Sequence, residues 1–174
     1  VAKEDIIHIE EERLRSVTKE ILMTQGISEK DALLATDALI KADLRGVESH
    51  GVSNMLRAYL GAFQSNSLNP KPNWKIVKET ASCATINSDN GLGIVVAPQA
   101  MEIAVEKAKK TGAGIVTMNN CGHLGMLAYH SMIASDNDMI GTTMAACSPR
   151  MVPTYSSVRA LGTNPISYSA PADK

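Results

Sequence analysis

The sequence is poor in aromatic residues: Trp, Tyr and Phe together make up 3% of its 174 residues. A surface on which nucleic-acid bases could stack is therefore not expected. The core must be aliphatic, because hydrophobic residues still amount to 44% and include nine methionines. A chain of this length buries roughly two thirds of its unfolded surface, which suffices for one compact domain or for one and a fraction.

An excess of one charge and a long apolar run are also lacking. Seventeen basic and 18 acidic side chains leave a net charge of −1, so a basic surface for nucleic acid is not expected. Apolar runs such as Leu92–Ala97 stop far short of the roughly 18 residues of a membrane-spanning helix. The acidic N-terminus has no apolar signal core. We therefore expect a cytoplasmic protein that binds neither nucleic acid nor a membrane.

Cysteine occurs only at Cys83, Cys121 and Cys147, and never with CxxC spacing. This odd number indicates reduced thiols in a cytoplasmic protein rather than a disulfide framework. His123 and His130 are seven residues apart, outside the spacing of about three to five that zinc-binding histidine pairs favour. No metal site is predicted.

Two further motifs are incomplete. Gly91 and Gly93 precede a predicted helix, but Val96 stands where a dinucleotide-binding fingerprint needs its third glycine, so we interpret them as a plain turn. The segment Asp136–Asp138 begins like a calcium-binding loop, yet the later glycine and glutamate are missing. It is interpreted as a turn as well.

Hydrophobic periodicity predicts helices in the first part of the chain. Ser28 with Asp31 forms a cap-like pair, and Gly26 is a stop signal for the helix before it. The predicted elements are helices from Leu14 to Leu22, from Ser28 to about Gly46 and from Ser53 through Phe63, followed by a connector over Asn66–Asn73.

Short strands and helices alternate after the connector, with turn residues between them. We therefore expect a mixed α/β chain of the α+β class, with a helical domain over 1–72 and a mixed domain over 73–174. The elements of the second domain are strands at Trp74–Lys78, Cys83–Asn87, Gly114–Met118, Met139–Ala146 and Ile166–Ala170, helices at Val95–Lys110 and Leu124–Ser135, and a long loop at Ser148–Pro165.

The segment Asp43–Gly51 joins two predicted helices and combines charged residues, a histidine and two glycines. Loops at helix ends often carry catalytic groups, because the scaffold holds them in place. Ser49 could set the tautomer of His50 through a hydrogen bond. The alternative is an ordinary turn with a solvated histidine. A hydrolytic serine is not predicted, because Val47 stands where a nucleophile elbow needs glycine.

A second histidine lies in the segment Asn119–Gly125, between a strand and a helix. The glycines around His123 permit close approach of a ligand, and a helix starting near Leu124 would direct its N-terminal amides at an anion. A simple capping loop explains the same residues equally well. The stiff, polar loop from Ser148 to Pro165 is a third candidate, because long loops in compact domains are more often functional than idle.

Taken in order, the segments DLRGVESHGVSNMLRAY, NNCGHLGMLAYHS and GTNPIS resemble the type-2 malate/L-lactate dehydrogenases. That family also includes ureidoglycolate, sulfolactate and diketogulonate-type oxidoreductases and cyclic imino-acid reductases. The resemblance runs from about Glu11 to the C-terminus. Three ordered motifs are specific, although each one alone is weak.

The resemblance implies a non-Rossmann fold in which N-terminal helices precede a largely antiparallel sheet with helices. It also implies a homodimer, NAD or NADP as cofactor, and a small 2-hydroxy or 2-oxo acid as substrate. By motif, His50 is the catalytic acid/base, Ser49 orients it, and His123 contacts substrate or nicotinamide. The residues that the resemblance places near the cofactor are Ser148, Gly162, Thr163, Asn164 and Pro165.

The sequence departs from the family pattern in two respects. Many relatives carry an arginine four residues after the Ser-His-Gly histidine, where this chain has Asn54, so we expect Arg57 to pair with the substrate carboxylate instead. Family members are also much longer, and the aspartate that partners the histidine belongs to an Asp-Met-Ala-Thr-like motif expected beyond Lys174. The chain thus resembles the N-terminal half of such an enzyme, which alone would be inactive.

Reduction of a 2-oxo acid needs a hydride on the carbonyl carbon and a proton on its oxygen, and histidine suits the proton step. The predicted function is therefore NAD(P)-dependent oxidoreduction of malate or lactate, with ureidoglycolate, sulfolactate or a cyclic imino acid as alternative substrates. The alternative from another class is a non-catalytic dimerisation or ligand-binding module.

Overall fold

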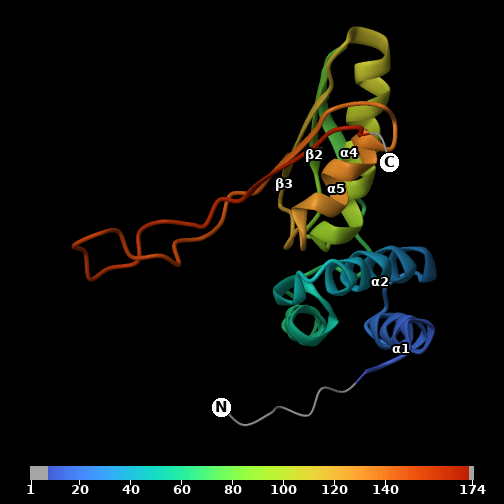
Figure 1. Ribbon diagram of the computed structural model, residues 1–174, viewed down its shortest axis with the longest axis vertical. Helices are drawn as coiled ribbons and strands as arrows, with labels where there is room; N and C mark the ends of the chain where they lie inside the picture. The colour runs from blue at the N-terminus through green and yellow to red at the C-terminus, as the bar shows by residue number, and fades with distance from the viewer. Residues whose placement is uncertain (1–7, 173–174) are drawn as a thin grey trace. The chain divides into compact units, whose positions relative to one another are not determined.

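The computed structural model describes residues 8–172 of the chain. They fold as two compact units, of which one ends at Lys71 and the other begins at Pro72. In Figure 1 the first unit is coloured from blue to teal and the second from green to red. Each unit is described by itself.

The first unit consists of helices. Ser28 caps the second helix, because its hydroxyl accepts a hydrogen bond from the Asp31 amide at 3.2 Å, as the sequence predicts. Leu22 and Leu39 are at most 1% exposed and belong to the apolar faces on which α1 and α2 meet. The elements are α1 (Glu11–Met23), α2 (Glu29–Leu44), a 3₁₀ turn η1 (Glu48–His50), a π-helical turn η2 (Val52–Leu56) and α3 (Arg57–Gln64).

The third predicted helix is divided into two parts. Residues expected to begin an α-helix at Ser53 form the π-helical turn η2, and α-helical geometry starts only at Arg57. Single π-helical turns are rare and occur frequently at functional sites. This one lies directly after the Ser49-His50 pair.

The second unit combines two small sheets with two helices. Strand β2 pairs antiparallel with β1 and parallel with β3, and α4 forms the crossover between the parallel strands. Strands β4 and β5 are a separate antiparallel pair. The elements are β1 (Lys75–Glu79), β2 (Cys83–Asn87), α4 (Gly93–Thr111), β3 (Ile115–Asn119), α5 (Leu127–Ser135), β4 (Gly141–Met144) and β5 (Ile166–Ser169).

These elements confirm the predicted mixed α/β class with helices first. The antiparallel pairing predominates, with β2 and β3 as the parallel exception. Among the described residues, no helix is long and apolar enough to cross a membrane.

Strand β2 and helix α4 supply the core of the second unit. Ile86 and Val96 are fully buried, and Ala100 is 5% exposed. Trp74 and Val116 pack against this cluster. Buried and partly buried residues alternate along β2, because successive side chains of a strand point to opposite faces.

The chain between β4 and β5 forms a two-stranded arm, defined here as residues 145–165, which extends away from the rest of its unit (Figure 1). Near its base the Ala145 amide donates to the Pro165 carbonyl oxygen at 3.2 Å. Farther out, Met151 and Leu161 form an antiparallel bridge. The predicted long loop therefore has its two halves paired along its length.

Helix α5 begins later than predicted. It was expected at Leu124 but starts at Leu127, because the chain first turns at Gly125, whose φ of +63° lies in the left-handed region. The predicted start of this helix at Leu124 is therefore wrong.

Replacing Ile86 by Ala should lower the free energy of unfolding by about 2–5 kcal/mol, because it leaves a cavity between β2 and α4. The matched control is Ile115→Ala in the neighbouring strand, where the side chain is 59% exposed; its effect should stay within about 0.5 kcal/mol. Urea denaturation followed by circular dichroism measures both. Equal losses would contradict the core described above.

Candidate active site

His50 lies in a hydrogen-bonded turn between α2 and η2. The His50 amide donates to the Val47 carbonyl oxygen at 2.9 Å, and the Gly51 amide donates to that of Glu48 at 3.1 Å. The Val47 amide in turn donates to the carbonyl oxygen of Ala42 in α2 at 2.8 Å. These bonds fix the backbone position of His50, whose side chain is partly buried.

The Ser49 side chain lies beside the His50 ring, with Ser49 Oγ and His50 Nδ1 2.9 Å apart. When the hydroxyl accepts, Nδ1 carries the ring proton and Nε2 keeps a lone pair. When the hydroxyl donates, the two nitrogens exchange these states. The contact therefore couples the orientation of Ser49 to the tautomer of His50.

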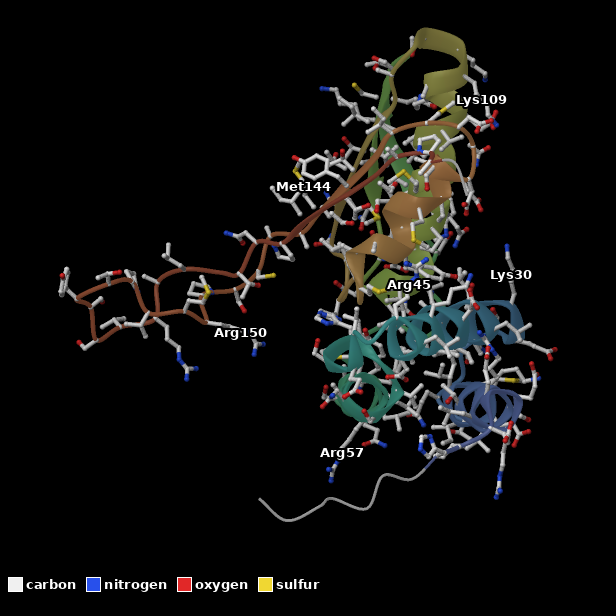
Figure 2. The ribbon with its side chains drawn as sticks, in the orientation of Figure 1. Lys30, Arg45, Arg57, Lys109, Met144 and Arg150 are labelled. Atoms are coloured by element: carbon white, nitrogen blue, oxygen red, sulfur yellow. The ribbon has the colours of Figure 1, made fainter. Side chains whose placement is uncertain are left out.

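Asn54 and Arg57 follow this turn. The Asn54 side-chain amide donates to the Glu48 carbonyl oxygen at 2.8 Å, so Asn54 stabilises the turn with a side-chain hydrogen bond. Arg57 is the first residue of α3. Its exposed side chain extends away from the helices of its unit in Figure 2.

In the second unit, the loops that follow the parallel strands β2 and β3 are joined by hydrogen bonds. The Asn90 amide donates to the Asn120 carbonyl oxygen at 2.8 Å, and the Gly122 amide donates to that of Gly91 at 2.9 Å. Parallel strands commonly bind ligands outside their carboxyl ends. His123 lies in the second of these loops.

Gly93 lets the first turn of α4 pack against the loop of His123. A Cβ atom at this position would overlap the carbonyl oxygens of Gly122 and His123. The preceding segment is a turn, as predicted, because the Gly91 amide donates to the Ser88 carbonyl oxygen at 2.8 Å. The absence of a side chain at Gly93 therefore allows the start of α4 and the His123 loop to pack backbone against backbone.

The exposed His123 ring is oriented by its own loop. The Gly125 amide donates to His123 Nδ1 at 3.2 Å. Because Nδ1 accepts this bond, the neutral ring carries its proton on Nε2. The Nε2–H group can then donate a hydrogen bond to an oxygen atom of a ligand.

A third histidine, His130 in α5, supports the same loop from inside. It is 1% exposed, and its Nε2–H donates to the Leu124 carbonyl oxygen at 2.7 Å. Its Nδ1 has no hydrogen-bond partner among the described residues, and burial lowers the pKa of the ring. From the sequence, His130 was weighed only as a metal ligand. Its apolar neighbours along α5 were the signal that could have revealed burial.

Cys147, the neighbour of the predicted cofactor residue Ser148, contacts the predicted segment Gly162–Pro165 at the base of the arm. The Cys147 amide donates to Asn164 Oδ1 at 3.0 Å, and a Cβ atom at Gly162 would overlap the Cys147 carbonyl oxygen. The structure thus brings both predicted segments together. The exposed residues among them are Ser148, Thr163, Asn164 and Pro165.

The candidate residues divide between the units. Ser49, His50 and Arg57 belong to the first unit, whereas His123 and the residues of the arm belong to the second. Within residues 8–172, no group of three or more His, Cys, Asp or Glu side chains could hold a metal ion. All three cysteines are free thiols.

An imidazole that has one ring nitrogen held by a hydrogen bond, as in the His50 turn of the first unit and separately in the His123 loop of the second, is of a class suited to moving a proton or to binding an oxygen atom of a ligand. The family model described as malate/L-lactate dehydrogenase matches residues 9–174. The chain belongs to this family.

Relatives match nearly the whole chain. The malate dehydrogenase of Pyrococcus abyssi is 42% identical over 168 residues, which are 97% of this chain and 46% of that protein. The L-sulfolactate dehydrogenase of Methanocaldococcus jannaschii is 41% identical over 155 residues, or 89% and 45% of the two chains. The more distant ureidoglycolate dehydrogenase (NAD(+)) of Escherichia coli K12 is 30% identical over 166 residues, or 95% and 47%. The chain spans about half the length of these relatives.

A solved structure shows the same fold. The malate dehydrogenase from Pyrococcus horikoshii OT3 superposes with a TM-score of 0.94 at 40% identity, covering 100% of this chain and 50% of that one. The predicted malate/L-lactate dehydrogenase-like fold is therefore confirmed.

The buried His130 should make the stability of the fold depend on pH. Its pKa is lowered from 6.5 in the folded state, so its contribution is intact above pH 6.5 and is lost as the pH falls toward the lower folded pKa, because only the unfolded ring takes up the proton. His130→Gln should flatten this dependence. Urea denaturation at pH 7.5 and at lower pH compares the two proteins. The same acid-induced loss in both would exclude His130 as its source.

Proposed function

We propose that the protein transfers a hydride between NAD(P) and a small 2-hydroxy or 2-oxo acid. The observation that carries this proposal is the Ser49–His50 pair, 2.9 Å apart, on a turn tied to α2. A general acid/base needs a fixed position and a defined tautomer; the turn supplies the position, and we assign the tautomer in which Nδ1–H donates to Ser49 Oγ. Membership of the malate/L-lactate dehydrogenase family supports the reaction class.

Malate is the substrate that we propose first, because a malate dehydrogenase is among the relatives with about 40% identity. Lactate follows from the description of the family. Sulfolactate and ureidoglycolate are alternatives supported by the names of other relatives, and a cyclic imino acid is a further one. These substrates share a carboxylate beside the carbon that exchanges the hydride; the proton is exchanged at oxygen in the hydroxy acids and at nitrogen in the cyclic imino acid.

In the oxidation direction, His50 Nε2 takes the proton of the substrate hydroxyl while the carbon loses its hydride and the carbonyl forms. Donation of Nδ1–H to Ser49 Oγ keeps the Nε2 lone pair available for this step. In the reverse direction, the His50 imidazolium returns the proton to the carbonyl oxygen. A nicotinamide cofactor, when bound, would take up the hydride in the first direction and supply it in the second. Proton transfer of this kind contributes about 10²–10⁴-fold to the rate.

His123 and Arg57 bind the substrate in this proposal. The Nε2–H group of His123, fixed by the bond from Gly125, donates to a substrate oxygen. The exposed guanidinium of Arg57 pairs with the carboxylate, for which its planar fork of N–H donors is well suited.

The base of the arm fits part of NAD or NADP. The exposed hydroxyls of Ser148 and Thr163 are hydrogen-bond donors and acceptors suited to ribose and phosphate oxygens. The Asn164 Oδ1 atom is already engaged with Cys147, which leaves its NH₂ group to donate. Gly162 and Pro165 shape the backbone beside them.

The arm and β5 also support a homodimer. Large apolar side chains are exposed there, among them Val158 at 66% and Tyr168 at 70%, and exposed apolar patches commonly mark protein interfaces. We therefore expect sedimentation equilibrium to give twice the mass of one chain, and Val158→Asp to lower the dimer fraction. A monomer at micromolar concentration would contradict this part of the proposal.

His50→Asn in the whole protein should lower kcat by about 10²–10⁴-fold, because it removes the group that moves the proton. Binding of reduced nicotinamide cofactor, followed by its fluorescence, should stay within a few-fold of the unsubstituted protein. The matched control is His8→Asn, an exposed histidine outside the helices, which should leave kcat unchanged.

Retained turnover in His50→Asn would overturn the assignment of the acid/base. Cofactor binding without turnover of any 2-hydroxy or 2-oxo acid by the unsubstituted protein would instead favour the non-catalytic ligand-binding module.

A further inference from the structure

Asp43 contacts the end of the His50 turn from the last turn of α2. Its Oδ2 atom accepts a hydrogen bond from the Val52 amide at 2.9 Å. Val52 is the first residue of η2, so the carboxylate caps the helical segment that follows the turn. A carboxylate suits this place, because the first amides of a helix lack partners within the helix and carry partial positive charge.

Gly51 provides the space that this carboxylate occupies. A Cβ atom at Gly51 would overlap the Asp43 carboxylate, with its Oδ1, Cγ and Oδ2 atoms as the nearest neighbours. The φ of −87° and ψ of −172° at Gly51 are available to any residue. Glycine is therefore needed here for space rather than for backbone freedom.

The His50 turn is thus attached to α2 on both sides. Before His50, the Val47 amide donates to the carbonyl oxygen of Ala42. After His50, the Val52 amide donates to the carboxylate of Asp43. The two acceptors are consecutive residues of one helix, so the segment between these attachments cannot shift along α2 without breaking one of them.

We propose that Asp43 is a positioning residue for the His50 imidazole, and that Gly51 serves the same function by admitting the carboxylate. This inference rests on the proposed function, since it gives His50 the proton-transfer step. The carboxylate acts through the backbone of the turn. A displacement of about 1 Å in such a group can cost about 100-fold in rate.

The test compares Asp43→Ala, Asp43→Asn and Gly51→Ala in the whole protein. Asp43→Ala and Gly51→Ala should lower kcat by about 10- to 100-fold, with the KM for the cofactor unchanged within about twofold. Asp43→Asn should restore kcat to within a few-fold of the unsubstituted protein, because the amide oxygen can still accept from Val52. A side chain with only a general structural role would not give this separation of kcat from KM, nor this rescue.

Asp37→Ala is the matched control. Asp37 lies on the same helix and pairs with Arg15 at 3.0 Å and with Lys41 at 2.9 Å, so its removal perturbs α2 without touching the turn. It should leave kcat unchanged, and thermal unfolding compares its stability with that of Asp43→Ala.

A kcat in Gly51→Ala equal to that of the unsubstituted protein overturns the proposal. If Asp43→Ala does not fold, Gly51→Ala is the variant that tests it. A kcat in Asp43→Asn as low as that in Asp43→Ala also overturns it. Failure of the proposed function is recognised separately, because the unsubstituted protein would then show no turnover or His50→Asn would retain it.

Discussion

The attachment of the His50 turn to α2 is the constraint on which the candidate chemistry depends. An imidazole can serve as acid and base only when its position and its tautomer are both defined. Backbone bonds from Val47 and Val52 to the end of α2 define the position, and the contact between Ser49 Oγ and Nδ1 supports the tautomer. Each neighbour of His50 has its own function in this arrangement. Asp43 caps η2, Ser49 contacts the imidazole ring, and Gly51 leaves space for the Asp43 carboxylate.

The second unit places a different histidine by different means. There the parallel pair β2 and β3 brings two loops together at one edge, and bonds between their backbones hold the loop of His123. The buried His130 supports this loop by its bond to Leu124. His130 thus has a structural role in holding this loop, whereas we assign proton transfer to His50.

Much of the fold could be predicted from the sequence, because period and turn chemistry are local. The strand Cys83–Asn87 and the cap at Ser28 have the expected positions. The start of α5 and the π-helical turn η2 could not be predicted, because the left-handed turn at Gly125 and the capping carboxylate of Asp43 depend on packing between segments. The burial of His130 is a different case, because the apolar residues beside it in α5 carried that information even though its spacing from His123 did not.

Isotope labelling of the transferred hydride tests the proposed dehydrogenase activity directly. Reduced nicotinamide cofactor carrying deuterium on the transferable position of carbon 4 is incubated with the whole protein and oxaloacetate or pyruvate. We expect a 2-hydroxy acid that carries one deuterium on carbon 2, seen by mass spectrometry, with one cofactor oxidised per product. A 2-hydroxy acid without deuterium, or no oxidation of cofactor with any 2-oxo acid of the family, would contradict this activity.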